Sequence, residues 1–206
     1  MIRTGNAPAL TARGAATRAR IIQTATDLMR TQGVASTSID AVLAESKTSK
    51  SQLYHYFADK DALVLAVIQR QAECVLAAQE ELLHNLKSLA NLRHWRDAVV
   101  QLSRQTNCAG GCPLGSLVPE LAEKPRSRAL LADGFRKWED YLVAGFTAMR
   151  ANGELKKGIN PLDLATALLA ALQGGLLLAQ TMRSTRPLEL ALDMAIDQIA
   201  AKRPGG

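Results

Sequence analysis

Apolar residues recur every three or four positions along most of the chain, which predicts an amphipathic helical protein. Ile21, Ala25 and Met29 belong to the first such run, and Gly33 follows it as a residue suited to the left-handed conformation that ends many helices. Later runs predict helices at about 93–107, 126–151, 161–184 and 187–202. No segment alternates convincingly between apolar and polar residues, so we expect an all-α fold.

Two short helices are predicted directly after the first. Thr37 stands three residues before Asp40 and Ser49 three residues before Gln52, which is the spacing of a capping box. The short helices therefore run from about 39 to 46 and from about 50 to 57. A longer amphipathic run follows to about position 89, with Asp59 as its N-cap, and a Gly-, Pro- and Cys-rich stretch at 107–125 interrupts the pattern.

Composition supports helices and locates the basic charge. Only eight residues are Phe, Trp or Tyr, whereas Ala and Leu are abundant, a balance that favours helices over strands. The formal net charge is +6. Residues 1–70 hold nine Lys or Arg against five Asp or Glu, so most of the surplus lies in the N-terminal third. This asymmetry favours nucleic acid as a partner of that part.

The two short helices predict a helix-turn-helix, in which the second helix enters the major groove of DNA. Leu53 and Phe57 lie four residues apart and face the helical core, which leaves the polar positions of that helix for DNA. Their hydroxyl, ammonium and amide groups bind phosphates, and Gln52 can also pair with adenine. We expect DNA contacts from Thr37, Ser38, Lys47, Ser49, Lys50, Ser51, Gln52, Tyr54, His55 and Lys60.

The segment SIDAVLAESKTSKSQLYHYFADKDAL, positions 38–63, resembles the DNA-binding motif of the TetR (tetracycline-repressor) family, above all in LYHYF followed three residues later by Lys. The resemblance implies a bacterial, all-α, homodimeric regulator. It places Tyr54, His55 and Lys60 at phosphate-contact positions, Ser38 at the start of the first short helix and residues 50–52 where bases are read. The GCPLGSL segment at 111–117 is similar to a loop of family members related to multidrug-efflux regulators.

Two positions depart from the family pattern, because Lys47 and Ser51 stand where Gly is common. Lys47 has a conformational cost if its φ is positive, and its ammonium is also placed to contact a phosphate. The match covers about residues 15–65. We accordingly expect a flexible basic arm at 1–14, a DNA-binding domain at 15–62, and an effector-binding and dimerisation domain at 63–206. Arg13 and Arg18 near the arm either contact DNA or are simply solvated.

Aromatic and apolar residues of the C-terminal part predict a pocket for an uncharged or weakly charged hydrophobic effector. Ordinary core packing is the alternative for each of them. The candidate lining residues are Trp95, Leu102, Cys112, Leu117, Val118, Phe135, Trp138 and Tyr141.

The last two helices are too apolar to face solvent, which predicts a four-helix interface with a second subunit. Gly174 and Gly175 each cost about 1 kcal/mol of helix stability relative to Ala, so a packing reason is expected. The alternative is burial within one subunit. The candidate dimerisation residues are Leu168, Leu172, Gly175, Leu176, Ala179, Leu188, Leu192 and Ile196.

The cysteines indicate a reducing compartment. There are three of them, Cys74, Cys108 and Cys112, which is an odd number, and the opening residues MIRTGNAPAL lack an apolar signal region. We expect a cytoplasmic protein without membrane contact, and read the apolar stretch 164–179 as a buried helix. Cys108 and Cys112 are a thiol sensor, a metal pair or inert apolar residues. No Cys/His spacing fits a metal site, so we expect no metal and no cofactor.

The sequence offers no nucleophile with a nearby base and no phosphate loop, so we do not expect an enzyme. The function it favours is a sequence-specific transcriptional repressor, released from operator DNA by a small hydrophobic effector. Two alternatives stay open: a thiol-responsive regulator that uses Cys108 and Cys112, and a helical adaptor without DNA binding.

Overall fold

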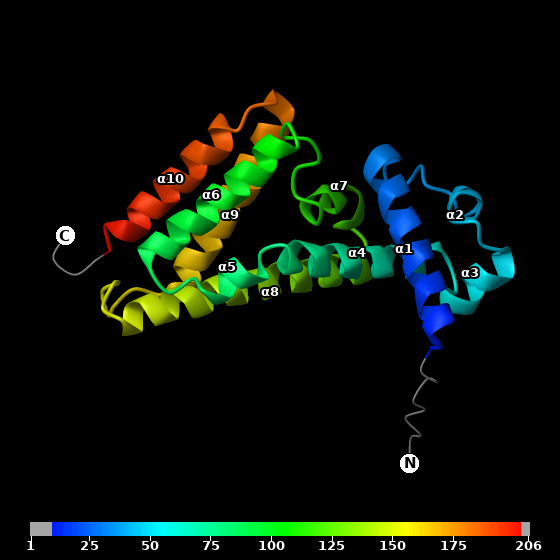
Figure 1. Cartoon of the computed structure of the whole chain (residues 1–206), viewed down its shortest axis with the longest axis horizontal. Helices are drawn as coiled ribbons and strands as arrows, with labels where there is room; N and C mark the ends of the chain where they lie inside the picture. Colours follow the sequence, from blue (N-terminus) through cyan, green and yellow to red (C-terminus); the bar gives the residue numbers. More distant parts are fainter. Residues whose placement is uncertain (1–9, 203–206) are drawn as a thin grey trace, which may run out of the picture. The chain divides into compact units, whose positions relative to one another are not determined.

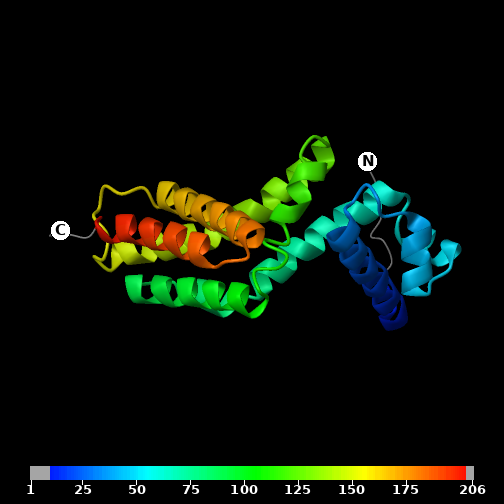
Figure 2. The ribbon, with the colours of Figure 1, turned by 90° about the horizontal axis from the view of Figure 1, so that it is seen from above.

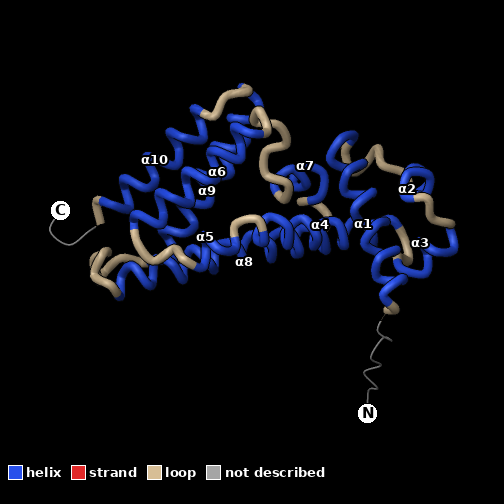
Figure 3. Tube along the Cα trace, viewed as in Figure 1, coloured by secondary structure: helices blue, strands red, loops and turns tan. Residues whose placement is uncertain are grey.

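The computed structural model describes residues 10–202, and within that range it contains helices and loops without a strand (Figures 1 and 3). The all-α prediction is therefore confirmed. The chain divides into two compact units, residues 1–70 and 71–206, and the division falls inside a helix. The elements are α1 Ala12–Gln32, α2 Ile39–Ser46, α3 Lys50–Tyr56, α4 Lys60–Ala77, α5 Glu80–His84, α6 Leu89–Gln105, the 3₁₀ helix η1 Gly115–Leu117, α7 Val118–Leu121, α8 Pro125–Ala151, α9 Pro161–Met182 and α10 Arg186–Ala200.

The first unit packs α2 and α3 against α1. The hydroxyl of Thr11 accepts a hydrogen bond from the amide of Gly14 and so caps α1, which ends at Gly33 with a φ of 86°. Gly33 is thus the C-cap, as predicted, but its ψ of 161° differs from that of the left-handed helical conformation that we expected. Because α1 begins at Ala12, the last three residues of the predicted basic arm are helical, while its residues 1–9, including Arg3, lie outside the described part of the chain.

The second unit contains a break that the apolar pattern did not predict. The helix expected to continue to position 89 ends at Ala77, and the short α5 follows. Gln79 explains the break, since its side-chain amide donates to the carbonyl of Val75 and its Oε1 accepts from the indole of Trp95 at 2.8 Å. The side chain of Gln79 takes the carbonyl of Val75, to which its own backbone amide would bond if α4 continued. That amide bonds to the carbonyl of Leu76 instead.

Helices α6, α9 and α10 lie side by side, with α8 against α9 (Figures 1 and 2). α6 begins at Leu89, four residues earlier than predicted, because the hydroxyl of Ser88 caps the amide of Asn91. The Cα atom of Leu188 on α10 would lie 2.9 Å from a Cβ placed on Gly175, so the glycine permits this close approach to α9. Gly175 therefore has its packing reason inside the subunit.

Helix α9 is long and apolar enough to cross a membrane by length and composition, the one such helix among the described residues. Its 22 residues extend beyond the stretch 164–179 that we read as a buried helix. Within the unit, α9 packs against both α8 and α10 and buries Leu168 and Leu172 completely. Only 33% of its most apolar window is buried, so α9 packs with one side and leaves apolar residues exposed on another.

Candidate nucleic-acid interface

The turn between α2 and α3 is built on a strained residue. Lys47 adopts the left-handed conformation, with φ 51° and ψ 44°, and the amide of Thr48 donates to the carbonyl of Leu43 at 3.2 Å. This is a helix end of the kind that glycine usually makes, and a side chain there costs about 1–2 kcal/mol. The conformational cost considered for Lys47 is therefore present, and its side chain is exposed.

Buried hydrogen bonds fix the same turn to the first helix. The hydroxyls of Ser46 and Thr48 lie 2.7 Å apart, and both residues are buried. The guanidinium Nε of Arg20 on α1 donates to the carbonyl of Ser46 at 3.0 Å. Sequence reasoning counted Arg20 only as one of the N-terminal basic residues, and its contact to a backbone carbonyl has no signal in the residue pattern.

The capping box of α3 is confirmed. The amide of Gln52 donates to the hydroxyl of Ser49 at 3.1 Å, and the amide of Ser49 donates to Oε1 of Gln52 at 2.9 Å. Because Oε1 is used in this way, the two-point contact with adenine that we considered for Gln52 requires the box to open. In the closed box, Nε2 is the atom of Gln52 left to face DNA.

The two faces of α3 differ as the spacing predicts. Leu53 and Phe57 are buried, and the guanidinium of Arg18 lies 5.4 Å from the centre of the Phe57 ring. Tyr54 is 44% exposed, a high value for so large an aromatic side chain. Tyr56, between these two faces, is half-buried. The exposed positions of α3 are Lys50, Ser51, Gln52, Tyr54 and His55.

Three further candidates, Thr37, Ser38 and Lys60, lie near the starts of α2 and α4. The role predicted for Thr37 is wrong. Ser38, not Thr37, caps α2, because its hydroxyl accepts from the amide of Ala41 at 3.1 Å. Thr37 is 1% exposed and its hydroxyl donates to the carbonyl of Gly33, so it supports the bend and does not face solvent. The ammonium of Lys60 donates one hydrogen bond to the carbonyl of Ala35 and keeps further donors for a phosphate.

Comparison with known proteins agrees with this geometry. Residues 21–67 match the bacterial regulatory proteins of the tetR family, and residues 88–195 match the tetracyclin repressor-like C-terminal domain. An HTH-type transcriptional regulator from the lacX 3′ region of Lactococcus lactis subsp. lactis is 32% identical over 184 residues, which cover 86% of this chain and 90% of that protein. The chain belongs to the TetR family. It is a DNA-binding transcriptional regulator with an N-terminal helix-turn-helix domain and a C-terminal helical domain.

Other relatives extend the likeness over the whole TetR-family chain. The transcriptional regulator AcuR of Cereibacter sphaeroides is 27% identical over 171 residues, 82% of this chain and 78% of its own. The crystal structure of reduced E. coli NemR has a TM-score of 0.73 and 26% identity, and covers 92% of this chain and all of that one. Salmonella enterica GusR has a TM-score of 0.70 and 26% identity, and covers 92% and 98%.

The candidate effector residues of this TetR-family protein fall into different environments. Trp95 and Trp138 are buried, but the indole of Trp95 is bonded to Gln79, whereas the Nε1 of Trp138 has no acceptor. Leu102 is 55% exposed on α6, so its prediction as part of an apolar lining is wrong for this structure. Tyr141 is half-buried against the ring of His84. The remaining candidates are buried or half-buried: Cys112, Leu117, Val118 and Phe135.

The candidate dimerisation residues mostly face the inside of the subunit. Those that are buried are Leu168, Leu172, Gly175, Ala179, Leu188, Leu192 and Ile196, and Leu176 is half-buried. For the buried ones, the alternative of packing within one subunit describes the structure. The same two helices expose Leu162 and a second apolar set, which we call the α9/α10 face: Leu177, Leu178, Met182, Leu190 and Met194. Apolar residues on two sides of each helix hid this distinction from the sequence.

The three cysteines are free thiols in the described part of the chain. Burial raises the pKa of the Cys112 thiol, and its sulfur accepts a hydrogen bond from the amide of Gly115 at 3.3 Å. A reactive thiol needs a lowered pKa, so Cys112 is poorly suited to sensing oxidants. Cys108 is also buried and has a positive φ of 55°.

Proposed function

We propose that this TetR-family regulator is a homodimeric, cytoplasmic, non-enzymatic repressor that reads its operator with the exposed face of α3. The observation that supports this most is the row of donors on a rigid helix. Ser49 and Gln52 cap α3, Leu53 and Phe57 anchor it, and Arg20 holds the preceding turn. Side chains held on a rigid element can present a fixed pattern to base edges and phosphates.

The roles of the exposed residues follow from their chemistry. Tyr54 and His55 each present a donor that suits a phosphate oxygen, and the ammonium groups of Lys60 and of Lys47 in the turn present more than one. Lys50 and Gln52 lie in the first turn of α3, the part of a recognition helix that meets base edges. Phosphate contacts set affinity and base contacts set sequence preference.

Dimerisation would supply the second half-site. The α9/α10 face exposes five large apolar side chains, with Met194 at 70% and Met182 at 64% exposure, and such a patch favours burial against another protein surface. Gly174 lies next to it with open space around its Cα, so a second helix can approach closely there. Two subunits would present their α3 helices to successive major grooves about 34–36 Å apart.

The effector would bind in the helical core beside Trp138. Among the described residues, the buried indole N–H of Trp138 has no acceptor, and an unsatisfied buried donor costs about 1–3 kcal/mol. Phe135 and Tyr141 lie one turn on either side of Trp138 on α8. A hydrophobic molecule with an acceptor oxygen would satisfy this donor, and it regulates only if it favours the state that does not bind DNA.

A gel shift with the DNA flanking the protein's own gene tests the proposal. We expect Tyr54→Ala and Lys60→Ala to weaken binding to specific and scrambled DNA alike, and Gln52→Ala to change the preference between them. Arg30→Ala, an exposed cation of α1 paired with Asp27, is the matched control and should leave binding within about twofold. Absence of any preference for the flanking DNA contradicts the proposed repressor.

The two tryptophans provide the test for the effector. Titration of lipophilic compounds should quench the fluorescence of the Trp95→Phe variant, which keeps Trp138, and release operator DNA. Trp138→Phe removes the indole N–H while it keeps an aromatic ring, so it should weaken effector binding about fivefold or more. A panel that affects neither fluorescence nor DNA binding contradicts this part of the proposal.

The thiol-responsive alternative has its own test. If oxidants release the operator, the Cys108→Ser and Cys112→Ser double variant should be insensitive to them. Unchanged release from the double variant rules the alternative out. The helical adaptor without DNA binding is set aside, because residues 21–67 match the DNA-binding domain of the family.

A further inference from the structure

A cleft lies where the end of α6 meets the turn between α9 and α10, entirely inside the second unit. Its volume is about 540 Å³. The lining residues are Arg104, Asn107, Cys108, Arg183, Ser184 and Thr185. None of the residues predicted to bind the hydrophobic effector is among them, so this cleft is separate from the site proposed beside Trp138.

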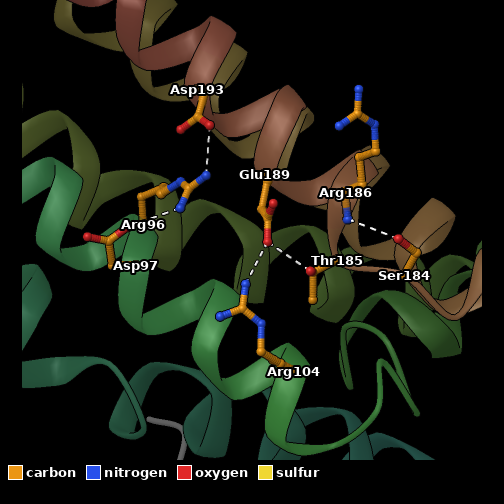
Figure 4. A network of polar contacts seen from close by, with 8 residues as sticks. All are labelled: Arg96, Asp97, Arg104, Ser184, Thr185, Arg186, Glu189 and Asp193. Atoms are coloured by element: carbon orange, nitrogen blue, oxygen red, sulfur yellow. Dashed lines mark hydrogen bonds and ion pairs between the residues drawn. The ribbon is translucent and has the colours of Figure 1, made fainter.

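The lining is rich in hydrogen-bond donors and positive charge. Arg104 donates to the carboxylate of Glu189 at 2.9 Å, and that carboxylate also accepts from the hydroxyl of Thr185 at 2.8 Å (Figure 4). Arg183 is exposed and forms no ion pair with any described residue. Arg104 therefore already binds one carboxylate, that of Glu189, and Arg183 is a second cation that pairs with no described acidic residue.

The first turn of α10 contributes side chains more than backbone amides. Thr185, which lines the cleft, is the N-cap of this 15-residue helix, and its hydroxyl donates to Glu189. The amide of Arg186 donates to the hydroxyl of Ser184 at 3.3 Å and Pro187 has no amide hydrogen, so the arginine side chains are the groups that would hold an anion. Arg186, one residue further, does not line the cleft, and its guanidinium points away from the Arg104 and Glu189 pair (Figure 4).

The backbone around the cleft is unusual as well. Among the described residues, four that are not glycine have a positive φ, and three of these, Asn107, Cys108 and Arg183, line the cleft. Such conformations cost about 1–3 kcal/mol each and concentrate at functional sites. Here they turn the chain at the ends of α6 and α9, and residues of both ends line the one cleft.

We propose that this cleft binds the carboxylate or phosphoryl group of a small molecule, with Arg183 and Arg104 as the cations that hold it. The bound oxyanion would take over part of the hydrogen bonding that Arg104 gives to Glu189. Because that pair joins α6 to α10, occupancy of the cleft would loosen a contact of the helix that bears Met194 on the α9/α10 face.

The test is an NMR titration of the full-length protein with inorganic phosphate or acetate at constant ionic strength, with chloride as the balancing anion. We expect saturable shifts of the amides of Asn107, Ser184 and Thr185. Arg183→Gln should weaken binding about tenfold, as for a lost charge-assisted hydrogen bond. Arg186→Gln removes the same charge three residues further along the chain, outside the cleft, and should leave the affinity unchanged.

A gain of affinity separates binding from general charge effects. Glu189→Gln removes the competing carboxylate and should tighten phosphate binding about threefold. Saturation by phosphate, by acetate or by both supports the proposal and identifies the group. Absence of saturation with both anions overturns it, as does an equal loss in Arg183→Gln and Arg186→Gln. No step uses DNA, so the result stands apart from that of the repressor test.

Discussion

The adjacent glycines Gly174 and Gly175 of α9 allow a comparison of two Ala variants that share the same gain in helix propensity. A Cβ on Gly175 would lie 2.9 Å from the Cα and 3.0 Å from the Cδ1 of Leu188, whereas a Cβ on Gly174 meets no atom within 4 Å. Both replacements by Ala gain about 1 kcal/mol of helix propensity. Only Gly175→Ala pays for overpacking, about 1–3 kcal/mol. Gly175→Ala should therefore be less stable than Gly174→Ala by about 1–3 kcal/mol.

Guanidinium unfolding followed by circular dichroism measures this difference. The two variants are compared at one protein concentration, because the unfolding of a dimer depends on concentration, and sedimentation checks that both have the same oligomeric state. In thermal scans the gap should be about 2–4 °C per kcal/mol for a chain of this size. Equal midpoints, or a more stable Gly175→Ala, would refute the reasoning that α10 approaches α9 at this glycine.

Three further changes test the turn, the dimer and the α6–α10 contact. Lys47→Gly should raise the free energy of unfolding by about 1 kcal/mol, because glycine adopts a positive φ without strain. If the Lys47 ammonium contacts a phosphate, the same change should flatten the slope of the logarithm of the DNA-binding constant against the logarithm of salt concentration by about one. An unchanged slope argues against that contact. Met194→Asp should give a helical monomer in sedimentation at micromolar concentration, whereas Leu102→Asp, at another exposed apolar position, on α6, should stay dimeric. Hydrogen bonds from Thr185 and Arg104 lower the pKa of Glu189, so its stabilising effect is present above its ordinary pKa and is lost as pH falls through the lowered value. Glu189→Gln should remove that acid-side loss in a pH series of unfolding midpoints, and an identical pH profile would contradict it.

The helix-turn-helix was the part of the fold that the sequence predicts best, because local rules decide it. Ser49 and Gln52 form their capping box within four residues, and Leu53 and Phe57 are buried at the expected spacing. The error at Thr37 has a local cause too. Two hydroxyl residues stand next to each other, and the preceding carbonyl of Gly33 takes the first of them.

What could not be predicted depends on contacts between distant residues. At the break of the long helix, Gln79 bonds to Trp95, sixteen residues later, and a pairing over that distance has no local signal. In α10 the four-residue spacing marks Leu188, Leu192 and Ile196 as one stripe, and these are buried. Leu190 and Met194 are apolar as well but exposed, so the sequence does not say which of the two sets packs within the subunit. The cleft beside Arg183 joins residues about 80 positions apart, from α6 and the α9–α10 turn, and had no sequence signal.

Selection of bound sequences from a random DNA pool tests whether a dimer of this protein reads operator DNA with α3. We expect enrichment of one motif with two-fold symmetry, with half-site centres about one helical turn, or a multiple of it, apart. Tyr54→Ala should enrich the same motif with weaker binding. A pool that is not enriched, or that yields a single asymmetric site, would contradict a dimeric repressor that reads DNA with α3.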